Sequence, residues 1–232
     1  MVSKGIEDID IRMPGDAYDT GKDMPTFNTY LIAIIRDVKG KVIGIHRQRS
    51  HSPTANFIGL MLPLTYFATT GKSYTITTTG NSTHGYAPAL NTGAACISYP
   101  NTEYSYPSYI VMIQVGSGQQ SNPYSAYTLA APIANGSGTG QLVYGQPSIP
   151  SAITVSGSEA YFVISQAFNN SSGATITITE VGIVIYLQLG SVFSSAPSFS
   201  GSLLVWYDVL SSALSIPNGG SLVIYYIFMV NP

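Results

Sequence analysis

The side chains best suited to chemistry in this sequence lie close together between residues 46 and 51. The stretch HRQRSH carries His46, Arg47, Arg49 and His51. An imidazole can move protons or bind a metal ion, and a guanidinium binds carboxylates and phosphates through paired hydrogen bonds. This cluster could therefore serve an active site, a nucleic-acid contact or a joint between subunits.

The spacing of the reactive residues argues against catalysis and against a metal site. His46 and His51 are five residues apart and do not share a helical face, and His84 has no second ligand at a metal-like spacing. Cys96 stands among small apolar residues, which is typical of a buried cysteine. The sequence contains no G-x-S-x-G elbow and no phosphate-cradling glycine loop. We therefore expect a protein that is not an enzyme and holds no metal or cofactor.

Charge is concentrated at the N-terminal end of the chain. All nine lysine and arginine residues and seven of the eleven acidic residues lie within residues 1–72. Charged residues make up 9% of the chain, compared with roughly 25% in an ordinary soluble domain. Residues 73–232 must therefore be stabilised by burial and hydrogen bonds. The formal net charge of −2 argues against a protein that coats nucleic acid.

A joint between subunits suits the basic cluster best. Residues 1–28 form an acidic arm punctuated by proline and glycine, and we expect it to become ordered against a neighbour. Arg47 and Arg49 can each hold a carboxylate of such an arm through two parallel hydrogen bonds. A solvated surface and a nucleic-acid contact remain as alternatives for the cluster. A cation site remains as an alternative for the carboxylates of the arm.

The basic cluster stands at the junction of two elements expected within residues 29–72. Two β-branched runs around Asp37-Val38-Lys39-Gly40 predict a β-hairpin. Ser52-Pro53 is a favourable helix start, with serine as the cap and proline at the first helical position. A short apolar helix is therefore expected over 53–67.

Short β-rich runs separated by turn-forming clusters fill residues 73–232 and predict an antiparallel, jelly-roll-like β-sandwich. The strand candidates are 73–79, 108–115, 159–168, 174–189, 202–210 and 221–230. Within 174–189 the apolar positions change phase near Thr179 and Glu180. Because side chains alternate with period two, such a change predicts a bulge or a corner.

The final strand candidate, SLVIYYIFMV, is apolar on both faces. In a two-layer sandwich one face meets the core and the other meets water. The second face should therefore be covered by another subunit or by the helix of 53–67, and we favour the subunit. This interpretation adds Tyr225 and Ile227 to the predicted subunit contacts Arg47, Arg49, His46 and His51.

The tyrosine-rich stretch SYPNTEYSYPSY offers a different kind of surface. Tyrosine rings can stack on sugars while their hydroxyl groups form hydrogen bonds. The residues concerned are Tyr99, Tyr104, Tyr106 and Tyr109. They would suit a host-recognition or glycan-binding module.

Sequence signals for the cell surface and for membranes are weak. Sequons of the N-x-[ST] type begin at Asn81, Asn135, Asn169 and Asn170, and their predicted loops should face outward. The polar, acidic N-terminus does not resemble a signal peptide. The longest apolar run, 57–67, is too short to span a bilayer. An extracellular existence would then require release by lysis or by another route, a condition that fits a virion protein.

Four stretches, in order, carry a resemblance to a known group of proteins. They are DVKGKVIGIHRQRSHSPTANF (37–57), GSGQQSNPYSAYTLAAPI (116–133), AYFVISQAFNNSSGATITITEVGIVI (160–185) and DVLSSALSIPNGGSLVIYYIF (208–228). This order resembles small virion structural proteins of viruses that infect thermophilic archaea, with related tail-associated proteins of phages. The group's pattern F-x-N-x-S/T-G-x-x-I-x-I-x-E-V-G is matched by Phe168, Asn170, Ser172, Gly173, Ile176, Ile178, Glu180, Val181 and Gly182.

The resemblance implies a thermostable building block of a virus particle without catalytic activity. We therefore expect a virion structural protein that forms a homo-oligomeric ring, such as a tail or nozzle adaptor, a turret or a vertex component, and links capsid to spike. Its partners would be its own copies together with capsid and spike proteins. A host-recognition module that binds a surface glycan is the alternative, because the tyrosine-rich stretch departs from the group's pattern.

Overall fold

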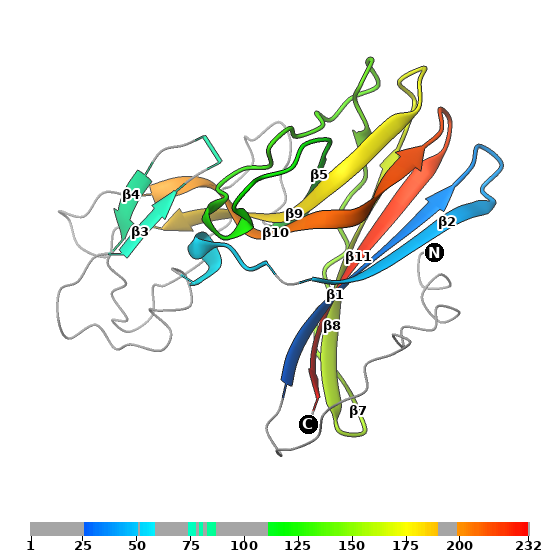
Figure 1. The fold of residues 1–232 in the computed structure, drawn as a ribbon. Helices are drawn as coiled ribbons and strands as arrows, with labels where there is room; N and C mark the ends of the chain where they lie inside the picture. Colours follow the sequence, from blue (N-terminus) through cyan, green and yellow to red (C-terminus); the bar gives the residue numbers. More distant parts are fainter. Residues whose placement is uncertain are drawn as a thin grey trace.

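The protein is mainly β, with antiparallel sheets (Figure 1). The computed structural model describes residues 26–50, 52–58, 74–77, 79–80, 83–86, 111–189 and 199–231. Their strands are β1 (Thr26–Arg36), β2 (Val42–Ser50), β3 (Tyr74–Thr77), β4 (Thr83–Tyr86), β5 (Val111–Gly116), β6 (Val143–Tyr144), β7 (Thr154–Ser156), β8 (Glu159–Asn169), β9 (Ile176–Leu189), β10 (Phe199–Ile216) and β11 (Ser221–Asn231). A short 3-10 helix, η2, spans Pro123–Ser125.

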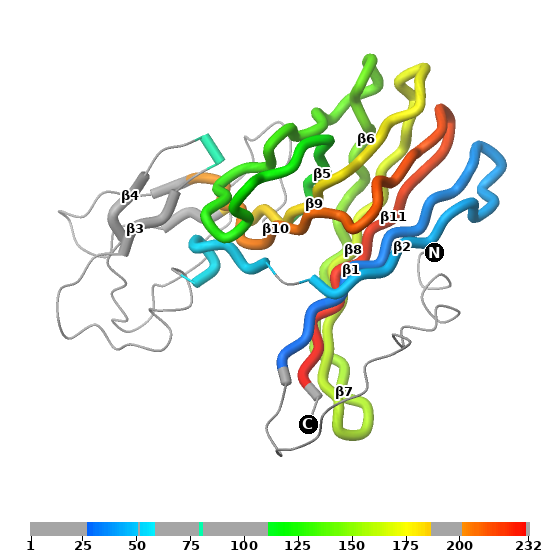
Figure 2. The backbone as a smooth tube through the Cα atoms, in the orientation of Figure 1, coloured from blue at the N-terminus to red at the C-terminus, as the bar shows by residue number. Residues whose placement is uncertain are grey.

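The strands form two principal sheets. The larger sheet has the order β2-β1-β11-β8-β6, with β7 also paired to β8, and the smaller has the order β10-β9-β5. Strands β3 and β4 pair with each other. In Figure 1 the long strands β9 and β10 bend away to the left from β1, β8 and β11, and Figure 2 traces the same path. All six strand candidates contain a strand, so the mainly antiparallel β class is confirmed.

The predicted hairpin is present and belongs to the larger sheet. The Asp37 Oδ1 atom accepts hydrogen bonds from the N–H groups of Lys39 and Lys41, both at 2.9 Å. Gly40 takes a φ of +77°, which glycine adopts without strain. Strand β1 also pairs with β11 from Thr26 to Arg36. The last three residues of the predicted arm, 26–28, are therefore strand, while the division of the chain at residue 73 stays a prediction.

The helix predicted to start at Ser52-Pro53 begins later. The Ser52 carbonyl accepts the Tyr207 N–H at 2.9 Å, and Pro53 forms an isolated bridge with Trp206. The Thr54 N–H donates to the Val205 carbonyl at 3.1 Å, and helical residues occupy 55–58. Pairing with β10 thus keeps the backbone of residues 52–54 extended. Ser52 therefore does not cap the helix as predicted. Residues 59–67 lie outside the described chain.

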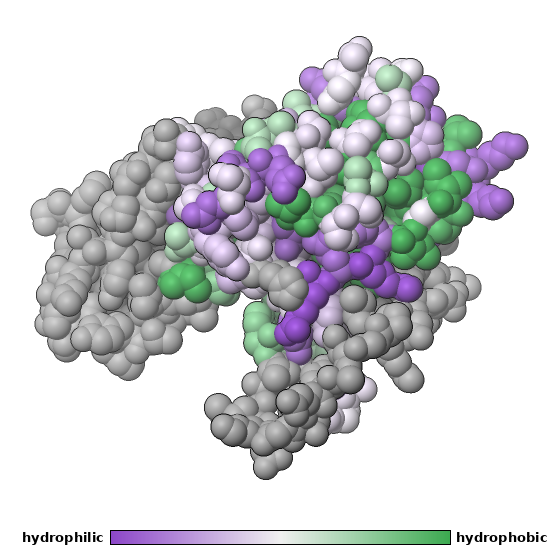
Figure 3. Space-filling model, in the orientation of Figure 1, coloured by the Kyte–Doolittle hydropathy of each residue, from purple (hydrophilic) through white to green (hydrophobic). Residues whose placement is uncertain are grey.

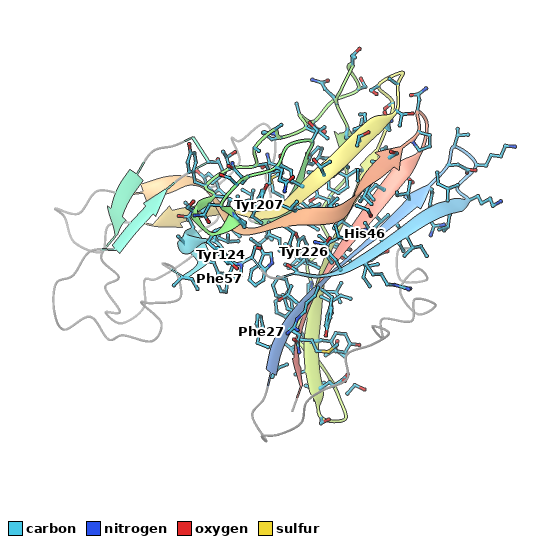
Figure 4. All side chains as sticks on the ribbon, viewed as in Figure 1. Phe27, His46, Phe57, Tyr124, Tyr207 and Tyr226 are labelled. Carbon is cyan, nitrogen blue, oxygen red and sulfur yellow. The ribbon has the colours of Figure 1, made fainter. Side chains whose placement is uncertain are left out.

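The main hydrophobic core lies between the two principal sheets. Leu31, Ile224 and Phe168 from the larger sheet share one buried cluster with Ile113 and Ile183 from the smaller sheet. Aromatic rings close one end of this cluster, where Phe57 meets Trp206 edge to face at a centroid distance of 5.4 Å (Figure 4). The two sheets therefore pack through one continuous apolar interior.

Both principal sheets also bury apolar residues on the face that points away from the main core. On the smaller sheet, Leu129 from the loop after β5 joins Leu204 and Tyr207 in a second cluster. On the larger sheet, Ile32, Ile34 and Ile227 lie in a third cluster, with Tyr225 half-buried beside them. The two-faced apolar character of β11 is therefore a feature of the folded chain. Phe57, from the described part of 53–67, packs instead on the main core.

The irregularity predicted near Thr179 and Glu180 is present. Strands β9 and β10 pair Val209 with Glu180 and then Leu214 with Ile178, so four residues of β10, 210–213, stand opposite Thr179. Ile178 and Val181, which are three residues apart, both enter the main core. The sequence of β9 shows the phase change, but the extra residues of the irregular pairing belong to β10.

Candidate functional site

Strand β2 forms an edge of the larger sheet and is the candidate site. Its residues pair with β1, and β2 ends the order of strands in the sheet. Val42, Ile43 and Ile45 are 38%, 52% and 54% exposed, and Val38 in the adjoining turn is 71% exposed. Figure 3 shows this hydrophobic patch on the right, at the hairpin end of the sheet. Exposed aliphatic side chains along a sheet edge are a typical site of association with another chain.

The two arginines of the cluster follow this apolar patch along the same face of β2. Arg47 and Arg49 alternate with buried or half-buried residues, and both are exposed. The Arg49 Nη2 group donates a hydrogen bond to the buried Asn28. Arg47 forms no hydrogen bond or ion pair with any described residue, so its guanidinium can donate hydrogen bonds to a carboxylate from outside.

Side chains on the other face of β2 form hydrogen bonds within the protein. His46 is buried, with Nδ1 3.1 Å from Ser212 Oγ and Nε2 2.8 Å from Gln48 Oε1. Gln48 Oε1 also accepts the Ser211 N–H at 2.9 Å, and its Nε2 group donates to the Val209 carbonyl at 3.1 Å. These bonds hold β2 against the irregular part of β10. The role of His46 at a subunit contact stays a prediction.

A buried polar cluster joins the end of β2 to β10 and β11. Asp208, which is 3% exposed, accepts hydrogen bonds from Ser50 Oγ at 2.6 Å and Tyr226 O–H at 2.8 Å. The Trp206 Nε1 group donates to Ser50 Oγ. Serine, histidine and carboxylate thus occur in this region, but His46 contacts Gln48 where a catalytic histidine would contact an acid. The contacts of His46 with described residues thus do not include a carboxylate.

A second buried carboxylate fastens the loop that covers the smaller sheet. Glu180 Oε1 accepts the N–H groups of Gly118 and Ala131 at 3.1 and 2.7 Å. Oε2 accepts the Ala130 N–H at 2.9 Å and the Tyr207 O–H at 2.8 Å. Sequence analysis missed this role, although a lone acid in an apolar strand is itself a signal of a specific partner.

Asn170 joins two of the connections between the principal sheets, the one from β8 to β9 and the one from β10 to β11. Its Nδ2 group donates to the carbonyls of Ala174 and Ile216, both at 2.8 Å, and its Oδ1 atom accepts Ser172 Oγ–H at 2.8 Å. Asn170 is 1% exposed. The expectation that this sequon faces outward is therefore wrong, because Nδ2 is already bonded inside the protein.

Of the remaining sequons, Asn135 and Asn169 are exposed. Asn81 lies outside the described chain. So do His51 and the predicted tyrosine surface of Tyr99, Tyr104, Tyr106 and Tyr109, whose roles stay predictions. Ile227 is buried and Tyr225 half-buried on the outer face of the larger sheet, and their part in a subunit contact also stays a prediction.

Buried tyrosines make the fold sensitive to alkali. Burial raises the pKa of Tyr226 well above its ordinary value, and Asp208 raises it further; burial also raises the pKa of Tyr207, with Glu180 adding to the effect. In the unfolded chain tyrosine ionises near pH 10. Above about pH 10 the unfolded chain therefore releases protons that the folded chain keeps, and stability falls as pH rises.

We expect the free energy of unfolding to decline as pH rises above about 10, as measured by chemical denaturation. Tyr226→Phe removes one of the ionising groups, so this variant should show a shallower decline. Equal slopes for the variant and the parent protein would contradict the assignment.

Comparisons with known proteins give no relative. No family model, no curated protein and no solved structure matches this chain. In the part of the chain that the structure describes, no group of three or more histidine, cysteine or acidic residues is placed to hold a metal ion. No helix among the same residues has the length and apolar character needed to cross a membrane.

Proposed function

We propose that this protein is a non-enzymatic structural subunit of a virus particle. It forms a homo-oligomeric ring, such as a tail or nozzle adaptor, a turret or a vertex component, and links capsid to spike. The observation that supports this proposal is the β2 edge, where exposed Val42, Ile43 and Ile45 adjoin Arg47 and Arg49. Apolar groups combined with arginine are characteristic of protein interfaces.

The distribution of charge supports assembly through this part of the molecule. Among the described residues, every lysine and arginine lies on the β1–β2 hairpin: Arg36, Lys39, Lys41, Arg47 and Arg49. Two of the described acids, Glu180 and Asp208, are buried. A specific charged contact with another copy therefore has to use the hairpin, because the rest of the described surface offers little charge.

The buried polar groups support a structural role over a catalytic one. Glu180 and Asp208 accept hydrogen bonds from backbone N–H groups and from hydroxyl groups within the interior. A carboxylate with its oxygen atoms occupied in this way fixes the positions of strands and loops. We also retain the jelly-roll-like description and the location in the virion as parts of the proposal, supported by the composition and by the resemblance of the β-strand pattern.

Substitution of both arginines tests the assembly surface. We expect Arg47→Ala with Arg49→Ala to convert the ring to monomers, because each change removes a charged donor from the edge. Native mass spectrometry measures the assembly, and circular dichroism checks that the fold is kept. Lys39→Ala with Lys41→Ala is the matched control, since it removes the same charge from the turn and should leave the ring intact. A double arginine variant that assembles like the parent protein would contradict the proposal.

The place in a virus particle is tested separately. We expect this chain in purified particles at a ring-like stoichiometry, a few copies for each vertex or tail, as measured by quantitative mass spectrometry. Its absence from the particles would contradict the virion role even if the isolated protein forms rings.

A further inference from the structure

The geometry points to a specific occupant of the β2 edge: the N-terminal arm of a second copy of this chain, added as an antiparallel strand. The inference rests on the proposed function, because it names the contact that would join the subunits of the ring. Strand β2 is nine residues long, and among the described residues it pairs with β1 alone, so its other side can offer N–H and C=O groups to a further strand.

Charge favours the arm as the occupant. Residues 26–50 contain five basic residues and one acid, which is a net charge of +4. Residues 1–25 contain six acids and three basic residues, which is a net charge of −3. The arm is therefore the acidic partner that the basic hairpin requires, and it is present in every copy.

The sequence of the arm also matches the face of β2 in detail. If the stretch GIEDIDI (5–11) is extended, Glu7, Ile9 and Ile11 share one face, because side chains of a strand alternate with period two. Ile45, Arg47 and Arg49 share the exposed face of β2. In an antiparallel register with Ile9 opposite Ile45, Glu7 stands opposite Arg47. This register thus places the aliphatic side chain of Ile9 opposite that of Ile45, and the carboxylate of Glu7 opposite the guanidinium of Arg47.

The direction of the chain favours a second copy over the arm's own subunit. The arm ends at Thr26, and Thr29 pairs with Ser50, so the arm enters the sheet beside the C-terminal end of β2. In the antiparallel direction, an arm paired with its own β2 would run toward Val42, whereas Thr26 lies near the opposite end of β2. Residues 12–25 would then have to return along the whole strand to reach Thr26. An arm from another copy does not require this return.

A charge exchange tests the register. Glu7→Arg alone and Arg47→Glu alone should each raise the dissociation constant of the ring about tenfold or more, because each places like charges opposite one another. The two changes together should restore assembly. Asp19→Arg combined with Arg47→Glu is the matched control and should not restore it. Failure of Glu7→Arg to weaken the ring would overturn the register while leaving the proposed assembly function in place.

A disulfide exchange tests whether the arm reaches a second copy. Two full-length variants, both with Cys96→Ser, carry Ile9→Cys and Ile45→Cys respectively. Paired residues of antiparallel strands lie close enough for a disulfide. After mixing and oxidation we expect a covalent dimer on a denaturing gel. A dimer supports the arm exchange, whereas a disulfide that forms only when both cysteines are in one chain would overturn it. A parent protein that is monomeric at all concentrations would instead overturn the proposed ring.

Discussion

Replacing Glu180 with alanine is expected to lower the free energy of unfolding by about 3–5 kcal/mol. The carboxylate accepts hydrogen bonds from three backbone N–H groups and from the Tyr207 hydroxyl. Its removal leaves these donors unpaired in the interior, where water cannot replace the lost acceptor. The covering loop from 117 to 131 should then separate from the smaller sheet.

The surroundings of Glu180 leave its side chain little room for a different position. A Cβ atom at position 116, opposite Glu180 in the β5–β9 pairing, would lie 2.3 Å from Glu180 Oε1. Glutamine would keep the shape but would turn an amide N–H₂ group toward backbone donors, so Glu180→Gln should also destabilise the fold.

Urea denaturation of Glu180→Ala and Glu159→Ala measures this effect. Glu159 is exposed on β8 and provides the matched control, with an expected change within about 0.5 kcal/mol. Hydrogen exchange should show the largest loss of protection at Gly118, Ala130 and Ala131. A change in Glu180→Ala as small as that in the control would contradict the assigned role.

Asn170→Ala should produce the second large loss of stability, about 2–4 kcal/mol. The side chain joins Ala174 in the β8–β9 connection to Ile216 at the end of β10. The backbone of Asn170 adds two more links, because its N–H donates to Gly220 and its carbonyl accepts the Gly219 N–H. The β8–β9 and β10–β11 connections therefore both depend on one residue.

Asn169→Ala is the control for this prediction. Asn169 precedes Asn170 in the chain but is exposed, so its replacement should change the free energy of unfolding by less than about 0.5 kcal/mol. Thermal and urea unfolding of the two variants measure the difference. Similar stability of both variants would show that the side-chain contacts of Asn170 do not hold the crossings together.

Several features of the fold could be predicted because they depend on neighbouring residues in the chain. The alternation of side chains located the strands, and Asp37-Val38-Lys39-Gly40 located the hairpin turn through an aspartate that bonds its own backbone. The phase change at Thr179 and Glu180 indicated an irregular pairing without naming the strand that supplies the extra residues.

Other features depend on contacts between distant segments. Ser52 and Pro53 have the local chemistry of a helix start, but β10 offers their backbone a partner about 150 positions later in the chain. Hydrogen bonds to that strand outweigh the local preference, since propensity is only a weak tendency. For the same reason the sequon at Asn170 suggested an exposed loop, although its amide group is bonded in the interior.

The sequence by itself determined the mainly β character, the hairpin and the concentration of positive charge in the first 72 residues, because these follow from local pattern and composition. Only the tertiary structure decided that consecutive strands β8 and β9 belong to different sheets, and that β2 lies at an edge. It also decided that Glu180 and Asp208 are internal hydrogen-bond acceptors. These outcomes depend on the pairing of residues far apart in the chain. A strand carries the same alternation whether it stands at the centre or at the edge of a sheet.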